Sequence, residues 1–377
     1  MEHIFDFTLI IGIVFSSIII FFLSKRSKKE LHQYLLITLF SFIIYELFSA
    51  YTVFHKIQLA KFLNIVFSYY ISLFIGPLIF IYIKSLFVSN DKLIKKDFFH
   101  FIPFIVYLFY KPIIYIVYFQ SNIFNTANTE VLKIKLLVEE ILSPLYFIFY
   151  LLLSLFLFNK YKKAIKSNYS NLTEFDFNWI RYLLTIFILV IGLDLIFGFL
   201  GPTYLSHELF SVIALDIGII YLGYYGINQS RVLLPDFLVA EINNNEDDTK
   251  KSEKHQLSSF SEHEIEELKL SLENIFKNDR PYLDENLTLK KLADLVSTSD
   301  KKLSTLLNQY MNISFYDIIN KYRVEAVIEK MTSEDSEKYS LIGIAYDCGF
   351  SSKSSFNRIF KKETGFSPSE YKEQSEP

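Results

Sequence analysis

Residues 341–371 read LIGIAYDCGFSSKSSFNRIFKKETGFSPSEY, and the fold of the C-terminal part of the chain can be predicted from them. It starts with a short apolar helix that ends at Gly349, a residue that readily adopts the left-handed cap conformation. Ser351 or Ser352 then caps a second helix, whose apolar residues share one face. A short helix, a tight turn and a second helix form the helix-turn-helix layout. The pattern predicts one such unit over about residues 341–363.

The same pattern occurs earlier in the chain, over about residues 288–311. TLKKLADLV predicts a short helix that starts near Thr288, and the turn 297–299 opens a second helix with its leucines inward. Between the two copies, Ser314 caps the helix FYDIINKYRVEAVIEKM, which would be about 25 Å long at 1.5 Å per residue. Two recognition helices on one rigid connection could enter successive major grooves of DNA, ~34 Å apart.

At these residues the chain resembles a known family. GFSSKSSFNRIFKKETGFSPSEY (349–371) closely resembles the signature of the AraC family of transcriptional regulators, and residues 287–327 are similar to that family's first helix-turn-helix and connecting helix. The resemblance covers about residues 280–372. It implies an all-α domain with two helix-turn-helix units, which binds double-stranded DNA in the cytoplasm and works with RNA polymerase.

The resemblance also implies which side chains face DNA. The expected base-facing positions are Lys301, Ser304 and Thr305 in the first recognition helix and Ser354, Ser355 and Arg358 in the second. Lys353 and Lys361 are expected to meet phosphates. The helical register supports these choices, because the polar positions lie opposite the leucines and phenylalanines. Arginine can bind guanine through two hydrogen bonds, whereas Ser and Thr discriminate bases poorly, so we expect the second helix to supply most of the specificity. The alternative is a solvated polar face without a DNA role.

The N-terminal part of the chain is strongly apolar. Of all residues, 51% are hydrophobic and 18% aromatic. Runs of about 20 apolar residues, the length that crosses ~30 Å of hydrocarbon, occur at 4–23, 32–54, 62–86, 98–119, 135–158, 179–200 and 208–228. Because runs such as IIGIVFSSIIIFFL lack the polar face of a soluble helix, the sequence predicts a seven-helix transmembrane bundle over residues 1–228 rather than a large soluble helical protein.

The connections between these runs predict the orientation in the membrane. The first-to-second, third-to-fourth and fifth-to-sixth connections carry twelve Lys and Arg, against three in the alternate connections. Basic residues collect on the cytoplasmic side. We therefore expect an N-terminus outside, in the inner membrane of a bacterium, and a cytoplasmic C-terminal domain.

A polar tether is predicted to connect the two parts. Residues 229–260 are charged and lack apolar periodicity, which is typical of a flexible linker. The DNA-binding domain is expected over residues 261–377. Its start, Ser261 followed by Glu264, has the capping-box pattern of a helix. That helix either packs on the following domain, which we favour, or mediates dimerisation.

Ionisable residues within the predicted spans are candidates for signal sensing. They include Glu46, Lys111, Asp194 and Asp216. Such side chains usually face the interior of a bundle. Two interpretations stay open: they form a site for an unknown signal ligand or ion, or they form interhelical hydrogen bonds that only set the packing. A signal could act on the orientation, spacing or homodimer state of the DNA-binding domain.

Several classes of function are disfavoured by the sequence. The single cysteine, Cys348, cannot form an internal disulfide, and the histidines show no metal-ligand spacing. We find no phosphate-binding loop, no G-x-S-x-G and no H-E-x-x-H, and we expect no enzyme activity, no metal and no cofactor. The leading hypothesis is a membrane-embedded transcription factor. One alternative is a receptor or transporter whose helix-turn-helix domain binds protein, and another is a membrane enzyme with Asp194 and Asp216 as paired carboxylates.

Overall fold

In the computed structural model the chain divides into two compact units. The first consists of Met1–Asn159 and Phe177–Leu233, and the second of Lys160–Asp176 and Leu234–Pro377. The structure describes residues 2–57, 71–88, 97–110, 141–171, 177–200, 204–228, 261–332 and 339–375. Within these ranges all regular elements are helices, which confirms the predicted all-α fold class.

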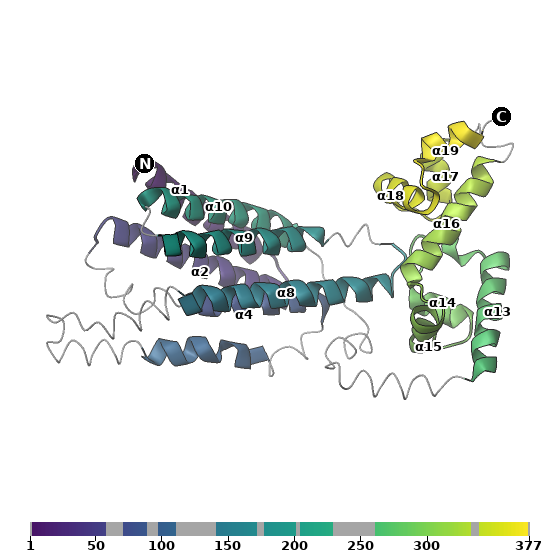
Figure 1. Ribbon diagram of the computed structural model, residues 1–377, viewed down its shortest axis with the longest axis horizontal. Coiled ribbons are helices and arrows are strands. Elements are labelled where there is room, and N and C mark those ends of the chain that lie inside the picture. Colours follow the sequence, from purple (N-terminus) through teal and green to yellow (C-terminus); the bar gives the residue numbers. More distant parts are fainter. Residues whose placement is uncertain are drawn as a thin grey trace. The chain divides into compact units, whose positions relative to one another are not determined.

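The first unit is built of long apolar helices. Their bounds are α1 Glu2–Ser24, α2 Leu31–Phe54, α4 Ile71–Phe87, α8 Ser143–Lys166, α9 Asn178–Leu200 and α10 Tyr204–Asn228. A further helix covers Phe98–Tyr110 and begins with the 3-10 turn η2, Phe98–Phe101. They run side by side as a bundle (Figure 1). Helix α1 packs against α2 and α10, α2 also packs on α4, and α9 packs on α10.

Every predicted span overlaps one of these helices. Among the described residues, four stretches are long and apolar enough to cross a membrane: Glu2–Ser24, Leu31–Phe54, Ser143–Lys166 and Leu209–Asn228. The described apolar parts of the other three helices are shorter. Residues 62–70 and 111–119 of the third and fourth predicted spans lie outside the described residues, so the count of seven stays a prediction.

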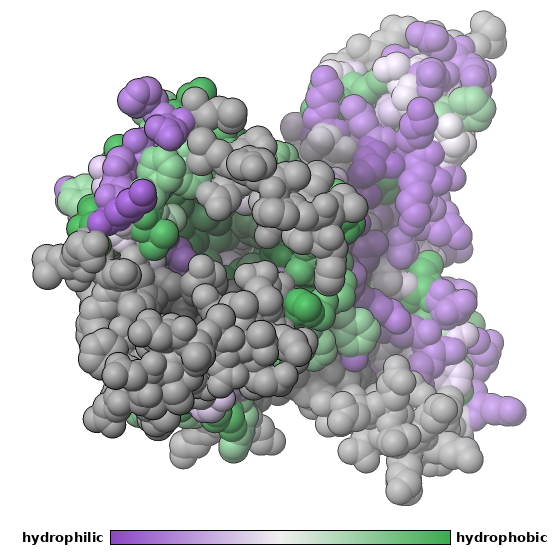
Figure 2. Space-filling model, turned by 60° about the vertical axis from the view of Figure 1, so that its left-hand side comes forward, coloured by the Kyte–Doolittle hydropathy of each residue, from purple (hydrophilic) through white to green (hydrophobic). Residues whose placement is uncertain are grey.

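The surface of the first unit is apolar. On α1, Phe7, Phe21 and Phe22 expose 64%, 55% and 56% of their surface. Figure 2 shows such hydrophobic residues in green over the helices of this unit, whereas hydrophilic residues, in purple, prevail on the second. A soluble monomer rarely exposes large contiguous apolar patches, and a membrane interaction surface does.

The second unit contains the predicted C-terminal domain. Its helices are α13 Glu262–Asn278, η6 Pro281–Leu283, α14 Leu289–Leu295, α15 Asp300–Thr305, α16 Phe315–Met331, α17 Leu341–Asp347, α18 Lys353–Thr364 and α19 Pro368–Ser375. Helix α16 covers the predicted connecting helix residue for residue. It joins a group formed by α13, α14 and α15 to a group formed by α17, α18 and α19 (Figure 1). One continuous apolar core includes residues from both groups.

Hydroxyl side chains start these helices where the sequence predicts. Thr288 accepts a hydrogen bond from Lys291 N at the start of α14, and Ser352 accepts one from Ser355 N at the start of α18. Ser299 and Ser314 cap α15 and α16 in the same way. Such a cap contributes about 1 kcal/mol.

Helix α13 packs on the domain that follows it. Its start has the predicted capping box, in which the Ser261 side chain and Glu264 bond each other's backbone N–H. Leu272 and Phe276 are buried in the core of the domain. Helix α13 therefore packs on the domain through these two residues, as the favoured interpretation expects.

Candidate functional site

Helix α18 presents one apolar and one polar face. Phe356, Ile359 and Phe360 are buried in the domain core. The opposite face exposes four of the predicted DNA-facing residues, namely Lys353, Ser354, Arg358 and Lys361, and Ser355 is half-buried. Because the apolar residues fix the rotation of the helix, this polar face is rigidly presented to solvent.

The polar face of α18 is attached to the first turn of α16. Arg358 donates a hydrogen bond from Nη2 to the Tyr316 hydroxyl, 2.7 Å away. One turn along, Lys362 Nζ lies 2.8 Å from Asp317 Oδ1. Partial burial raises the pKa of Asp317, but the hydrogen bonds from Lys362 and Ser314 outweigh it and hold the pKa below its usual value. The bond to Asp317 raises the pKa of Lys362 in turn.

Helix α15 differs from the sequence-based expectation. Of the three positions expected to face DNA, the structure places only Lys301 at the surface, and Ser304 and Thr305 expose 8% and 9%. Thr305 Oγ1 donates to the Lys301 carbonyl, and Asn308 Nδ2 donates to Ser304 Oγ. Both hydroxyls are thus engaged within their own helix.

Polar residues other than those predicted to face DNA are also exposed on the same recognition helices. After Thr305 the helix continues as a π-turn over Leu306–Tyr310, where Asn308 and Gln309 are exposed. Asn357 is exposed beside Arg358 on α18. Asn and Gln are the side chains that read adenine through two hydrogen bonds. Their spacing could have identified Asn308, which follows Lys301 by two helical turns.

Comparison with known proteins agrees with this geometry. Residues 292–374 match the helix-turn-helix domain family. The chain is 31% identical over 91 residues to an uncharacterised HTH-type transcriptional regulator of Staphylococcus aureus strain COL. The matched stretch covers 24% of this chain and 12% of that protein. It is 32% identical over 104 residues to the uncharacterised HTH-type regulator YijO of Escherichia coli K12, covering 26% of this chain and 36% of YijO.

A third relative covers more of both chains. The chain is 24% identical over 159 residues to the probable transcriptional regulator LumQ of Photobacterium leiognathi. The matched stretch covers 40% of this chain and 62% of LumQ. The chain thus spans less than two thirds of these relatives. No solved structure matches it significantly. The C-terminal domain is a helix-turn-helix domain of the AraC type, as the sequence resemblance implies.

The predicted sensing residues lie in different settings. Asp216 on α10 exposes 8% of its surface, and its Oδ1 has no hydrogen-bond partner among the residues that the structure describes. A Cβ at Gly12 of α1 would collide with this oxygen and with Leu47, so the carboxylate lies where α1, α2 and α10 meet. Glu46 on α2 is half-buried. The side chain of Asp194 and the whole of Lys111 lie outside the described residues.

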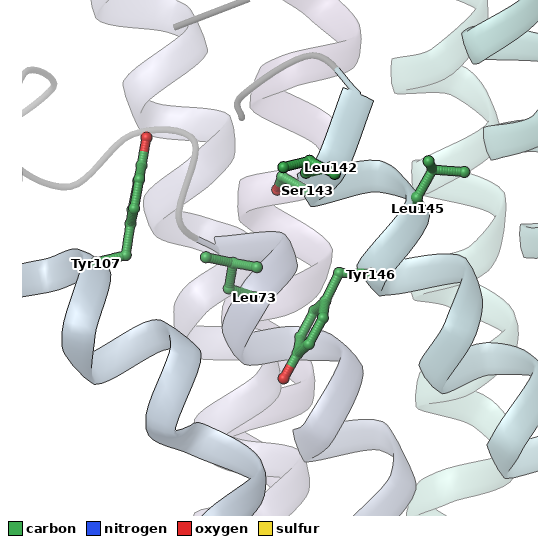
Figure 3. Close-up of a pocket in the computed structure, with 6 residues that line it drawn as sticks. All are labelled: Leu73, Tyr107, Leu142, Ser143, Leu145 and Tyr146. Atoms are coloured by element: carbon green, nitrogen blue, oxygen red, sulfur yellow. The ribbon is translucent and has the colours of Figure 1, made fainter. Parts of the chain in front are cut away.

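The first unit also contains a cavity. Its volume is about 380 Å³, within the range of roughly 300–1,000 Å³ that is typical of small-molecule sites. It is lined by Leu73 on α4, Tyr107, and Leu142, Ser143, Leu145 and Tyr146 at the start of α8. Figure 3 shows Tyr107 and Tyr146 on either side of Leu73. Of the predicted sensing residues whose side chains the structure describes, neither Glu46 nor Asp216 lines it.

The residues that the structure describes contain no group of three or more His, Cys, Asp or Glu side chains that could hold a metal ion. Cys348 is fully buried in the core of the C-terminal domain, and burial raises the pKa of its thiol to about 11. It therefore packs as a small apolar residue, as the sequence predicts.

Proposed function

We propose that the protein is a membrane-bound, sequence-specific DNA-binding transcriptional regulator, in which the apolar N-terminal unit senses a signal and controls promoter binding by the C-terminal domain. The observation that carries DNA binding is the exposed polar face of α18, held rigidly by the domain core. Arg358 is the residue on this face that can distinguish a base pair strongly, and Lys353 and Lys361 can neutralise phosphates beside it.

DNA binding is tested with the intact chain in lipid nanodiscs. Selection of binding sites from a random duplex library, followed by sequencing, should recover one preferred motif. Binding to that motif should weaken steeply as salt is raised, because counterions are released from each neutralised phosphate. Recovery of no motif, together with capture of a protein by the C-terminal domain, would favour the receptor or transporter alternative.

The orientation of the chain is tested independently of DNA. The basic connections support a cytoplasmic C-terminal domain, which is the compartment that contains the promoter. A reporter that is active only in the cytoplasm, fused after residue 240, should therefore be active. Periplasmic activity of a matched reporter at the same position would overturn the orientation, and the regulatory function with it.

Sensing by the first unit is supported by the buried carboxylate of Asp216 and by the apolar cavity at the start of α8. A buried carboxylate persists only in a packed or hydrated interior. Replacement of residues 1–228 by one unrelated span of the same orientation should keep DNA binding and abolish its dependence on growth conditions. Regulation that survives this replacement would show that the spans only anchor the protein.

A further inference from the structure

A short segment that is distant in sequence from the DNA-binding domain docks into it. The second compact unit includes Lys160–Asp176, which belongs to the connection between the fifth and sixth predicted spans. Within it, Tyr169 forms an antiparallel bridge with Thr288 at the start of α14. Leu289 N donates to the Asn168 carbonyl over 2.9 Å, and Ser170 Oγ donates to the Leu287 carbonyl over 2.7 Å. We call residues 166–170 the docking segment.

The docking segment completes the hydrogen bonding of a buried cation. Arg323 on α16 exposes 1% of its surface, and burial lowers the pKa of its guanidinium to about 10, so that it stays charged at neutral pH. Its Nε donates to the Tyr282 carbonyl (2.7 Å) and its Nη2 to the Asp284 carbonyl (2.8 Å). Nη1 donates to the Ser170 carbonyl (3.2 Å), and Nη2 also donates to Ser170 Oγ (3.1 Å).

These bonds make the docking specific. A buried charge is costly unless its donors are satisfied, and two N–H groups of Arg323 point at Ser170. Asn320 adds a third contact, because its Nδ2 donates to the Ser170 carbonyl over 3.1 Å while holding the Tyr316 carbonyl over 2.8 Å. The segment therefore accepts hydrogen bonds from donors of Arg323 and Asn320 on α16 that would otherwise lose these partners.

The docking segment also reaches the residue that holds Arg358. Lys166 Nζ lies 5.7 Å from the centre of the Tyr316 ring, and the hydroxyl of that ring accepts the hydrogen bond from Arg358. Lys166 and Arg358 therefore contact the same tyrosine, and a duplex that draws Arg358 away from Tyr316 acts on the residue that the docking segment also reaches.

We propose that the docking segment is an internal competitor of DNA, which keeps the C-terminal domain off its promoter until the membrane unit withdraws it. The segment is covalently continuous with α8 on one side and, through residues 171–177, with α9 on the other, so a rearrangement of these two predicted spans would pull on it directly. The inference rests on the proposed function, because it supposes that DNA binds the face that carries Arg358.

A disulfide across the docking contact tests the proposal in the intact chain. Tyr169 and Thr288 form a non-hydrogen-bonded antiparallel pair, for which Cα atoms lie about 4.5 Å apart, and disulfides need about 4.4–6.8 Å. The test variant is Tyr169→Cys with Thr288→Cys, and the control is Tyr169→Cys with the exposed Lys290→Cys. Cys348 is kept, since its buried thiol is inert.

The first measurement is cross-linking in native membranes without DNA. The test variant should form the disulfide on mild oxidation, and the control should form it much more slowly. Equal rates for the two variants would show that the segment does not dock, whatever the domain binds. This measurement is independent of DNA binding, so it separates a failure of the inference from a failure of the proposed function.

The second measurement is DNA affinity in nanodiscs, compared between the oxidised and reduced forms of the same test variant. The oxidised form should bind its motif at least about fivefold more weakly, the lower end of common coupling strengths, and dithiothreitol should restore binding. By reciprocity, saturating specific DNA should slow the cross-linking, and random DNA should not. Equal or tighter binding by the oxidised form would overturn the competition. No binding by the reduced form and none by Ser170→Pro, which removes the bonds of Ser170 N and Oγ to the Leu287 carbonyl, would overturn the proposed function instead.

Discussion

The guanidinium of Arg358 on α18 and the hydroxyl of Tyr316 on α16 are joined by a hydrogen bond of 2.7 Å across 42 residues of sequence. The bond attaches the predicted base-reading residue to the helix that connects the two helix-turn-helix units. Tyr316 is itself buried, with 4% of its surface exposed. The bond therefore orients Arg358, and DNA must compete with Tyr316 for one of its donors.

Replacement of Arg358 should reduce sequence discrimination. We expect Arg358→Ala to weaken specific binding by about 1–3 kcal/mol and to relax the preference at one base position. Lys361→Ala is the matched control, which should weaken binding to all sequences and reduce the salt dependence. Titrations of specific and random duplexes at several salt concentrations separate the two effects. An unchanged ratio of specific to random affinity in Arg358→Ala would show that the assigned helical register is wrong.

The hydroxyl of Tyr316 should oppose this contact. Tyr316→Phe keeps the buried ring and removes the competing acceptor, so we expect specific binding to strengthen by up to about 1 kcal/mol, the usual net value of a hydrogen bond. The gain should vanish in the double variant Tyr316→Phe/Arg358→Ala, because the two residues act through one bond. A gain of equal size with and without Arg358 would assign the effect to another contact.

The sequence predicts the local structure of the C-terminal domain well because local signals determine it. The hydroxyl caps at Thr288, Ser314 and Ser352, and the left-handed Gly349 with φ of 85°, each mark a helix end through contacts within a few residues. Apolar spacing likewise identifies the core face of α18. These features need no knowledge of distant segments.

The contacts of the candidate site were harder to predict. The pairs Arg358–Tyr316 and Arg323–Ser170 join residues 42 and 153 positions apart, and no periodicity relates their members. Ser304 and Thr305 are buried and form hydrogen bonds within their own helix, whereas a helical wheel shows only that they are polar. Sequence patterns identify the helices, whereas tertiary packing determines which polar side chains remain accessible.

The contrast between two glycines should reveal the packing around Arg323. Gly349 and Gly365 have nearly equal φ angles of 85° and 84°, so alanine carries a similar backbone strain at both. A Cβ at Gly349 would lie 2.5 Å from the Tyr282 carbonyl oxygen and 2.9 Å from Arg323 Nε, whereas nothing lies within 4 Å at Gly365. We expect Gly365→Ala to cost about 1–2 kcal/mol and Gly349→Ala to cost at least about 2 kcal/mol more, through overpacking.

The two variants can be compared in the intact chain. Cys348 is the single cysteine and is fully buried in the domain core, so its labelling by a thiol reagent in increasing urea reports opening of that core. Gly349→Ala should shift the labelling midpoint to lower urea by more than Gly365→Ala does. Equal shifts would show that strain alone, and not contact with Arg323 and Tyr282, decides the cost.

The Asp317–Lys362 ion pair should give the domain a pH-dependent stability. The pKa of the Asp317 carboxyl is lower in the folded domain than in the unfolded chain, where it is about 3.9. Asp317 therefore adds to the free energy of unfolding above about pH 3.9, and this addition is lost as the pH falls through the pKa of the folded state. Because the pKa of Lys362 is raised in the folded domain, its addition to the free energy of unfolding is lost only above about pH 10. Because the lysine is 57% exposed, the pair contributes at most about 1 kcal/mol.

Asp317→Asn should therefore destabilise the core at pH 7 and have little effect near pH 3. The stability is measured by labelling of Cys348 with 4,4′-dithiodipyridine, which reacts at acidic pH. An effect of Asp317→Asn that is equally large at both pH values would show that the carboxylate acts through packing or the Ser314 cap rather than through its charge.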